Sequence, residues 1–246
     1  MIDRIIRAIN PDHSGDLVEI GPGQGALTLP LLKRCQTLTA IELDRDLIAS
    51  LQNEADKLGK LNLINQDVLT IDLDTLAADR TLRLVGNLPY NISTPLMFHL
   101  LESANCIKDM HFMVQKEVAE RIVSSPGGDH YGRLSVMMQY HCETFYLFDV
   151  PPQCFKPAPK VDSAIIRLIP RQTKAYEVGN HTIFSELVRL AFQQRRKTLA
   201  NGLKSLLTKA DIEKAGIDPG IRAERLSGHE FGQLSIIASS LSESSG

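Results

Sequence analysis

A short apolar run leads into a cluster of glycines at Leu17-Val18-Glu19-Ile20-Gly21-Pro22-Gly23-Gln24-Gly25-Ala26. The apolar residues predict a buried strand, and residues 26–33 predict the helix after the turn. Glycine permits positive φ and close backbone approach, so the turn is typical of a nucleotide-like ligand site. Its third glycine comes one place earlier than in the G-x-G-x-x-G of dinucleotide enzymes. Glu19 would repel a pyrophosphate, whereas a carboxylate suits the cation of a sulfonium cofactor.

Further apolar runs follow the turn at regular intervals. The predicted strands are 38–42, 61–64, 82–86 and 110–114, and the predicted helices are 47–57, 93–101 and 134–140. Ser93 is the expected N-cap of its helix, with Pro95 in the first turn. Two later strands, 144–150 and 164–169, are joined by a proline-rich loop. Strands that alternate with helices predict an α/β fold with a Rossmann-like, mostly parallel sheet, and we expect the last strand to be antiparallel.

The pattern changes in the last quarter of the chain. Residues 184–207 predict one long amphipathic helix, and Ser227-Gly228-His229-Glu230 is a capping box that predicts a final helix through Leu241. We therefore expect a catalytic domain over residues 1–178 and a small helical domain over residues 179–246.

Charge is distributed unevenly although the net charge is only −2. Residues 1–155 contain 13 Lys and Arg against 20 Asp and Glu, whereas residues 156–209 contain 11 against 3. A basic stretch is either a solvated helix face or a surface for a polyanion such as RNA. No apolar run approaches the ~20 residues of a membrane span. The four cysteines are far apart and form no C-x-x-C pair, which favours a cytoplasmic protein without a disulfide framework or a metal site.

Four polar or glycine positions follow successive predicted strands, namely Gly21, Glu42, Asp67 and Asn87. The carboxyl ends of parallel strands meet at one edge of the sheet, where open α/β sheets bind ligands. Glu42 can accept hydrogen bonds from both hydroxyls of a ribose, and Asp67 can accept one from an adenine amine. Each acid alone could equally be a solvated residue at a strand end. As an ordered set, the four positions predict S-adenosylmethionine as the cofactor.

The fourth of these strands ends in the tetrapeptide Asn87-Leu88-Pro89-Tyr90. The amine of adenine is a poor nucleophile because its lone pair is delocalised into the ring. Two acceptors, the Asn87 side-chain oxygen and the Leu88 carbonyl, would favour the pyramidal nitrogen that attacks a methyl group. Pro89 stiffens the turn, and Tyr90 offers a face on which the base can stack. Phe155 is a candidate second stacking surface, although it could instead anchor the loop.

Several longer segments extend these motifs. They are residues 18–23, 41–44, 86–93, 131–136, 155–163 and 192–199. Together they resemble the small-subunit ribosomal RNA adenine dimethyltransferases over nearly the whole chain. The resemblance implies dimethylation of the exocyclic amines of two adjacent adenines near the 3′ end of 16S ribosomal RNA in the immature small subunit.

The resemblance also implies a set of site residues. The implied catalytic residues are Asn87, Leu88, Pro89, Tyr90 and Phe155, the implied cofactor contacts are Glu19, Gly21, Gly23, Glu42, Leu43, Asp67, Val68 and Asn87, and the implied RNA contacts are Lys156, Lys160, Arg195, Arg196, Lys197 and Lys204. We expect Arg196, Lys197 and Lys204 to share one face of the long helix. Members of this family carry a further segment before the position of Met1 that lies over the cofactor. We therefore expect weaker cofactor affinity and a more open site in this chain.

Other functions remain open from the sequence. A large-subunit ribosomal RNA adenine methyltransferase that confers antibiotic resistance would share the cofactor site and the tetrapeptide. A DNA adenine methyltransferase is disfavoured because no target-recognition domain is evident, and a nicotinamide dehydrogenase is disfavoured by the glycine spacing and Glu19. The chain could also act mainly by binding, as a ribosome-assembly factor. Because the helical domain has no heptad run, we expect a monomer.

Overall fold

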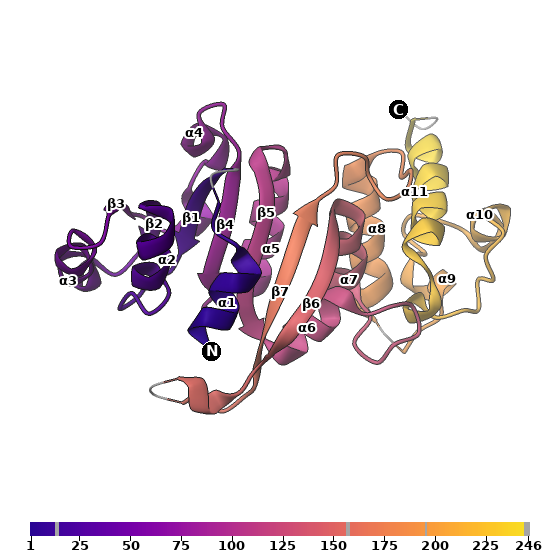
Figure 1. The fold of residues 1–246 in the computed structure, drawn as a ribbon. Coiled ribbons are helices and arrows are strands. Elements are labelled where there is room, and N and C mark those ends of the chain that lie inside the picture. The colour runs from indigo at the N-terminus through magenta and orange to yellow at the C-terminus, as the bar shows by residue number, and fades with distance from the viewer. Residues whose placement is uncertain (13–14, 156–157, 195, 244–246) are drawn as a thin grey trace. The chain divides into compact units, whose positions relative to one another are not determined.

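The chain divides into two compact units in the computed structural model, which describes residues 1–12, 15–155, 158–194 and 196–243 (Figure 1). The first unit comprises Met1–Ala119 and Thr144–Pro170, and the second comprises Glu120–Glu143 and Arg171–Gly246. The expected helical domain at 179–246 falls within the second unit. That unit also includes residues 120–143 and 171–178, so these compact units do not divide at residue 178.

One sheet forms the framework of the first unit. Its strands are β1 (Asp16–Ile20), β2 (Thr37–Glu42), β3 (Lys60–Asn65), β4 (Leu82–Asn87), β5 (Ile107–Gln115), β6 (Cys142–Val150) and β7 (Ser163–Pro170). Within the described residues these seven strands have the order β3-β2-β1-β4-β5-β7-β6. The first five strands pair in parallel, and β7 is antiparallel to β5. The mostly parallel Rossmann-like sheet is therefore confirmed.

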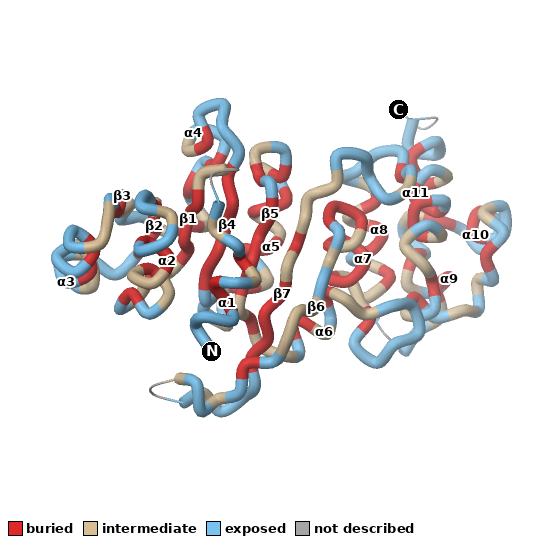
Figure 2. Tube along the Cα trace, viewed as in Figure 1, coloured by how far each residue is buried: buried red, intermediate tan, exposed pale blue. Residues whose placement is uncertain are grey.

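The central strands are almost entirely buried because helices cover both faces of the sheet. In β4 every residue from Leu82 to Gly86 is buried, and four of the five residues of β1 are buried (Figure 2). Continuous burial of this kind is typical of parallel strands between two helical layers. Figure 1 shows α1 (Ile2–Ile9) in front of the sheet and α5 (Ser93–Glu102) behind it. The carboxyl ends of β1, β2 and β4 thus reach the same edge of the sheet.

The remaining helices of this framework are short and connect the strands along the chain. They are α2 (Thr28–Cys35), α3 (Arg45–Ala55), η1 (Val68–Thr70), α4 (Leu73–Ala77), η2 (Ala104–Cys106), α6 (Lys116–Val123), which continues into the second unit, and η3 (Pro152–Cys154). The expected N-cap of α5 was wrong by one residue. Ile92 occupies that position, and the Ser93 hydroxyl donates to the Tyr90 carbonyl at 3.1 Å. Ser93 therefore braces the turn before the helix.

Helices dominate the second unit. They are α7 (Arg133–His141), α8 (His181–Gln193), α9 (Leu199–Gly202), α10 (Lys209–Lys214), η4 (Ala223–Arg225) and α11 (Gly228–Glu243). The predicted capping box of α11 is present, because Ser227 Oγ accepts from the Glu230 amide at 3.2 Å and Glu230 Oε2 accepts from the Ser227 amide at 2.7 Å. None of the described helices is long and apolar enough to cross a membrane.

The expectation of one helix over residues 184–207 was wrong. Helix α8 ends at Gln193, and Gln194 has a non-helical backbone with φ −129 and ψ 71. Beyond it, the amide of Leu199 donates to the Ile221 carbonyl at 2.7 Å and the amide of Ala200 to the Pro219 carbonyl at 3.1 Å. These hydrogen bonds to a distant segment replace the helical ones. Tertiary contacts therefore override the apolar periodicity of this stretch.

Candidate functional site

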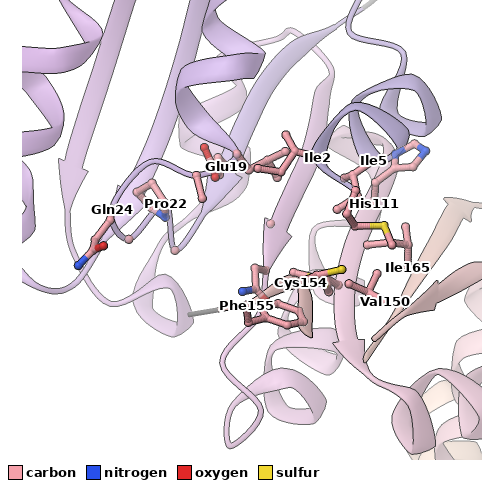
Figure 3. A pocket seen from close by; sticks show the side chains of 18 residues that line it. Ile2, Ile5, Glu19, Pro22, Gln24, His111, Val150, Cys154, Phe155 and Ile165 are labelled. Carbon is pink, nitrogen blue, oxygen red and sulfur yellow. The ribbon is translucent and has the colours of Figure 1, made fainter. Parts of the chain in front are cut away.

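A cavity of about 450 Å³ opens at the carboxyl ends of β1 and β4, and all of its lining residues belong to the first unit (Figure 3). Its wall is formed by three sets of residues. They are Met1 with Ile2 and Ile5 of α1, most of the turn between Gly21 and Leu27, and Cys154 and Phe155 from the loop after β6. Glu19, Gly86 and Asn87 also line it. The structure therefore brings the glycine turn and the start of the predicted catalytic tetrapeptide to one cavity.

The glycine turn exposes its backbone to this cavity. Gly21 and Gly23 have positive φ values of 67 and 54, which side chains with a Cβ adopt only with strain. A Cβ placed on Gly23 would meet no atom within 4 Å, so the peptide faces open space. A ligand can approach the backbone of the turn at this point, as the sequence predicted.

Glu19 lies under the turn with only 2% of its surface exposed. Its Oε2 atom has no hydrogen-bond partner among the described residues. Burial raises the pKa of this carboxyl to about 7, and the charge of Glu42 acts in the same direction. A buried, unpartnered carboxylate oxygen beside a cavity is costly unless a ligand supplies a donor or a positive charge. This environment fits the cationic cofactor that the sequence predicts.

Glu42 holds the turn in place from the neighbouring strand. Its Oε2 atom accepts from the Gly23 amide at 3.0 Å, and its Oε1 atom accepts from the Asp44 amide at 2.9 Å. Each carboxylate oxygen keeps a further lone pair, so a ribose hydroxyl can still donate to it. The side chain thus connects the end of β2 to the glycine turn that follows β1.

Glu42 and three other predicted cofactor contacts lie near this edge but do not line the cavity. Leu43, directly after Glu42, is 67% exposed. Asp67 accepts from the Leu69 amide at 3.0 Å through Oδ1 and so caps η1, while Val68 is buried. Their positions directly after β2 and β3 are those that the sequence predicted.

Asn87 ends β4, is exposed and lines the cavity. Its neighbour Leu88 is buried, and the Leu88 amide donates to the Met113 carbonyl of β5 at 3.0 Å. Pro89 follows, and its carbonyl accepts from the Ile92 amide at 3.1 Å. These bonds fix the backbone on both sides of the Leu88 carbonyl. The tetrapeptide is thus a turn held by backbone hydrogen bonds, with Asn87 at the wall of the cavity.

The two predicted aromatic surfaces come from different parts of the first unit. Tyr90 is half-buried, and its hydroxyl lies 2.7 Å from the hydroxyl of Ser163, the first residue of β7. Phe155 lines the cavity and packs partly against the hydrophobic core (Figure 3). Both readings of Phe155, as a loop anchor and as a surface of the site, are compatible with this position.

Sequence reasoning missed His111 of β5, a titratable residue of the cavity wall. It is 3% exposed, and neither ring nitrogen has a hydrogen-bond partner among the described residues. Burial lowers the pKa of His111 to about 4, so the ring is neutral near pH 7. A single histidine within an apolar strand carries no distinguishing pattern, and only the fold reveals it.

The predicted RNA contacts are exposed wherever the structure describes them. They are Lys160, Arg196, Lys197 and Lys204, whereas Lys156 and Arg195 lie outside the described residues. Because the long helix is interrupted, Arg196 and Lys197 occupy the connection between α8 and α9, and Lys204 follows α9. The expectation that these three share one helix face was therefore wrong. Their exposure and charge still suit contact with phosphates.

Comparison with protein families and curated proteins gives one consistent result. The family described as "Ribosomal RNA adenine dimethylase" matches residues 1–239. A "Ribosomal RNA small subunit methyltransferase A" of Xylella fastidiosa (strain Temecula1) is 57% identical over 232 residues, which cover 94% of this chain and 88% of the relative. The protein of the same name from Xanthomonas campestris pv. campestris (strain B100) is 51% identical over 233 residues, covering 95% of this chain and 89% of the relative.

Solved structures share the fold over nearly the whole chain. A dimethyladenosine transferase from Plasmodium falciparum has a TM-score of 0.76 at 25% sequence identity, with 95% of this chain and 93% of that chain covered. The 23S rRNA methyltransferase ErmE has a TM-score of 0.72 at 26% identity, with 96% of each chain covered. The second unit is therefore part of the shared architecture.

Proposed function

Since the chain belongs to the ribosomal RNA adenine dimethylase family, we propose that it dimethylates the exocyclic amines of two adjacent adenines near the 3′ end of 16S ribosomal RNA. It is a methyltransferase that uses S-adenosylmethionine and acts on ribosomal RNA. The curated relatives at 50–57% identity are all named for the small subunit, which supports 16S ribosomal RNA as the substrate. We further propose that the substrate is the immature small subunit and that the enzyme is a cytoplasmic monomer.

One observation carries this proposal: Asn87 lies at the edge of the sheet where the glycine turn also opens onto the cavity. A methyl donor and an acceptor amine must lie side by side for transfer, and this arrangement provides adjacent places for both. S-adenosylmethionine supplies the activated methyl group. The cofactor would be held by the unpartnered oxygen of Glu19 and by the backbone of Gly21 and Gly23. Further contacts to the cofactor would come from the adjoining edge of the sheet, from Glu42, Leu43, Asp67 and Val68.

The chain's own residues make the adenine amine reactive. Asn87 Oδ1 and the Leu88 carbonyl accept hydrogen bonds from the two amine protons, which favours a pyramidal nitrogen with an available lone pair. Pro89 fixes its own φ angle and so restricts the conformation of the turn. The hydrogen bond from the Leu88 amide to the Met113 carbonyl holds the turn against β5. Once methylated, the nitrogen becomes acidic and releases its proton to water, so no strong base is needed. Tyr90 and Phe155 would hold the base by stacking.

RNA binding would use the exposed basic residues. Lys160 of the first unit and Arg196, Lys197 and Lys204 of the second can each neutralise a phosphate. Residues 156–209 contain 11 Lys and Arg against 3 Asp and Glu, so this stretch favours a polyanion over a neutral partner. Lys156 and Arg195 belong to the same basic stretch.

The proposed function is tested by transfer of tritiated methyl groups to undermethylated small subunits, with large subunits and DNA as alternative substrates. We expect incorporation only into the small subunit, at two adjacent adenines. Incorporation into the large subunit would instead favour the activity named for ErmE, to which the fold is also similar.

The first prediction concerns Asn87→Ala. Loss of one transition-state acceptor should lower kcat by at least about 100-fold while RNA binding survives. Asn53→Ala, at an exposed position of α3, is the matched control and should keep full activity. Full activity of Asn87→Ala would refute the proposed site. If neither the wild type nor the control methylated any RNA but both bound it, the chain would be an assembly factor.

A further inference from the structure

Arg83 is a buried arginine in β4, four residues before Asn87, with 5% of its surface exposed. Each of its five N–H donors has an acceptor. Nε donates to Asp109 Oδ1 at 2.8 Å, Nη2 to Asp109 Oδ2 at 3.0 Å and to the Ile9 carbonyl at 2.6 Å, and Nη1 to the Asn10 carbonyl at 2.9 Å and to Asp12 Oδ1 at 2.9 Å. One side chain of β4 therefore connects β5 with the end of α1.

The carboxylate partner of Arg83 is as deeply buried as the arginine. Asp109 of β5 is 2% exposed and also receives a hydrogen bond from Arg167 at 3.4 Å. Burying such a pair costs desolvation energy that two packed apolar side chains would avoid. General stabilisation of the sheet therefore does not explain the pair well. The contacts to α1 provide a more specific explanation.

Arg83 satisfies the end of a helix from outside that helix. The last carbonyls of a helix have no partner within it, and a positive charge there is favoured by the helix dipole. In α1 these are the carbonyls of Ile9 and Asn10, and Asn10 closes the helix in the left-handed conformation with φ 47. The guanidinium thus fixes where α1 ends relative to β4.

Helix α1 forms one wall of the cavity. Ile2 and Ile5 line it together with Glu19 and His111, and all four are labelled in Figure 3. An isolated helix of eight residues is unstable in water, so its place depends on tertiary contacts. Ile5, Ile6 and Ile9 provide the apolar contacts, but these allow the helix to slide or rotate. The directional bonds of Arg83 restrict such movement.

We propose that Arg83, paired with Asp109, is a positioning residue that holds α1 against the cofactor cavity and so sets cofactor affinity. This inference rests on the proposed assignment of the cavity to S-adenosylmethionine. Arg83 does not line the cavity, so its effect is indirect. The Asn87 turn keeps its own hydrogen bonds at the far end of β4.

The test uses Arg83→Lys in the full chain. The ammonium of lysine retains the charge opposite Asp109 but cannot match five donors in the geometry of a guanidinium. We expect the Kd for S-adenosylhomocysteine, measured by titration calorimetry, and the KM for S-adenosylmethionine to rise about tenfold, as for the loss of about one charged hydrogen bond. We expect kcat at saturating cofactor to change less than about twofold, because the tetrapeptide is untouched.

Hydrogen exchange gives a readout that is independent of activity. Amides of residues 4–10 should exchange faster in Arg83→Lys than in the wild type, whereas those of β5 should not. Arg80→Lys is the matched control. Arg80 pairs with Asp16 at 2.5 Å at the opposite end of β1, away from this cavity. It should change neither the Kd nor the exchange of α1.

A milder variant covers the case in which Arg83→Lys does not fold. Asp12→Ala removes the one carboxylate that Arg83 contacts next to the end of α1. The Asp12 side chain is half exposed, so its loss leaves no buried cavity. It should raise the cofactor Kd in the same direction by a smaller factor. Unchanged Kd and unchanged α1 exchange in the folded variants would overturn the proposal, as would a fall in kcat with KM unchanged. The proposed function would still stand in either case if Asn87→Ala were inactive.

Discussion

Glu19 is the residue whose ionisation should be most closely linked to ligand binding. Its pKa is about 7 in the folded protein against an ordinary value of 4.5, mainly because of burial. Between these values the folded state holds a proton that the unfolded state has released. The free energy of unfolding therefore falls as pH rises from 4.5 to about 7 and is constant above that range. A bound cation lowers the pKa of Glu19, because the positive charge stabilises the ionised carboxylate over the protonated form.

We predict that the Kd for S-adenosylmethionine falls about tenfold between pH 6 and pH 8, following the ionisation of a group with a pKa near 7. Titration calorimetry in buffers with different ionisation enthalpies should show proton release on binding. Glu19→Gln should bind more weakly and without this pH dependence, whereas Glu54→Gln, at an exposed position of α3, should behave as the wild type. An unaltered pH dependence in Glu19→Gln would contradict the assignment.

The hydroxyl pair of Tyr90 and Ser163 offers a second residue-level prediction. The 2.7 Å contact fixes the ring of Tyr90 against the start of β7. Tyr90→Phe and Ser163→Ala should each raise the KM for RNA about fivefold, equivalent to one ordinary hydrogen bond of ~1 kcal/mol. The double variant should be no worse than either single variant. Cofactor affinity is the internal control and should not change, and additive effects on KM would show that the pair does not act as a unit.

At the scale of elements, α7 and the start of α8 meet through two histidines. His141 Nε2 lies 3.1 Å from His181 Nε2, and Lys174 Nζ lies 3.1 Å from His141 Nδ1. Since an ammonium can only donate, Nδ1 of His141 accepts and its Nε2–H donates to His181. A proton added to either ring would break this chain. Burial, with Lys174 and His181, lowers the pKa of His141 to about 3.

The pH dependence of stability follows from that shift. The unfolded state binds protons near pH 6.5, while the folded state resists them until about pH 3. The contribution of neutral His141 to the free energy of unfolding is therefore complete above pH 6.5 and is lost as pH falls toward 3. Urea unfolding should show a loss on the order of 1 kcal/mol between pH 7 and pH 5. His181→Gln should reduce this loss and His99→Gln, in α5, should not; equal acid sensitivity in both variants would refute the role of the pair.

Prediction from sequence succeeded for the elements whose pattern is local. The glycine turn, the strand before it and the capping box of α11 were all expected, because their residues specify geometry within a few positions. The break after Gln193 was not expected. It depends on carbonyls of Pro219 and Ile221, about twenty positions further along the chain, and no spacing rule within residues 184–207 reveals them.

At the scale of the whole chain, alternation of strands and helices was sufficient to predict the sheet and the edge at which the cavity opens. The positions of Glu42, Asp67 and Asn87 at the ends of successive strands were expected, whereas their order along the edge, which is Asp67, Glu42, Asn87, comes from the strand order β3-β2-β1-β4. The sequence did not reveal that the end of α1 would contact Arg83 of β4. It also did not reveal that residues 120–143 and 171–178 would pack with the last helices in the second unit. The contributions of Arg83, Asp109 and His111 were missed for the same reason. Buried polar residues within strands acquire their meaning only from the partners that the fold supplies.

The carboxylate of Glu42 has a consequence for the speed of ligand capture. Its bonds to the Gly23 and Asp44 amides are internal to the protein, so the glycine turn is preorganised. Little conformational entropy is then lost when the cofactor docks, which favours rapid association and exchange of spent for fresh cofactor. The proposed dimethylation of two adenines transfers four methyl groups, so it needs that exchange several times for each RNA molecule.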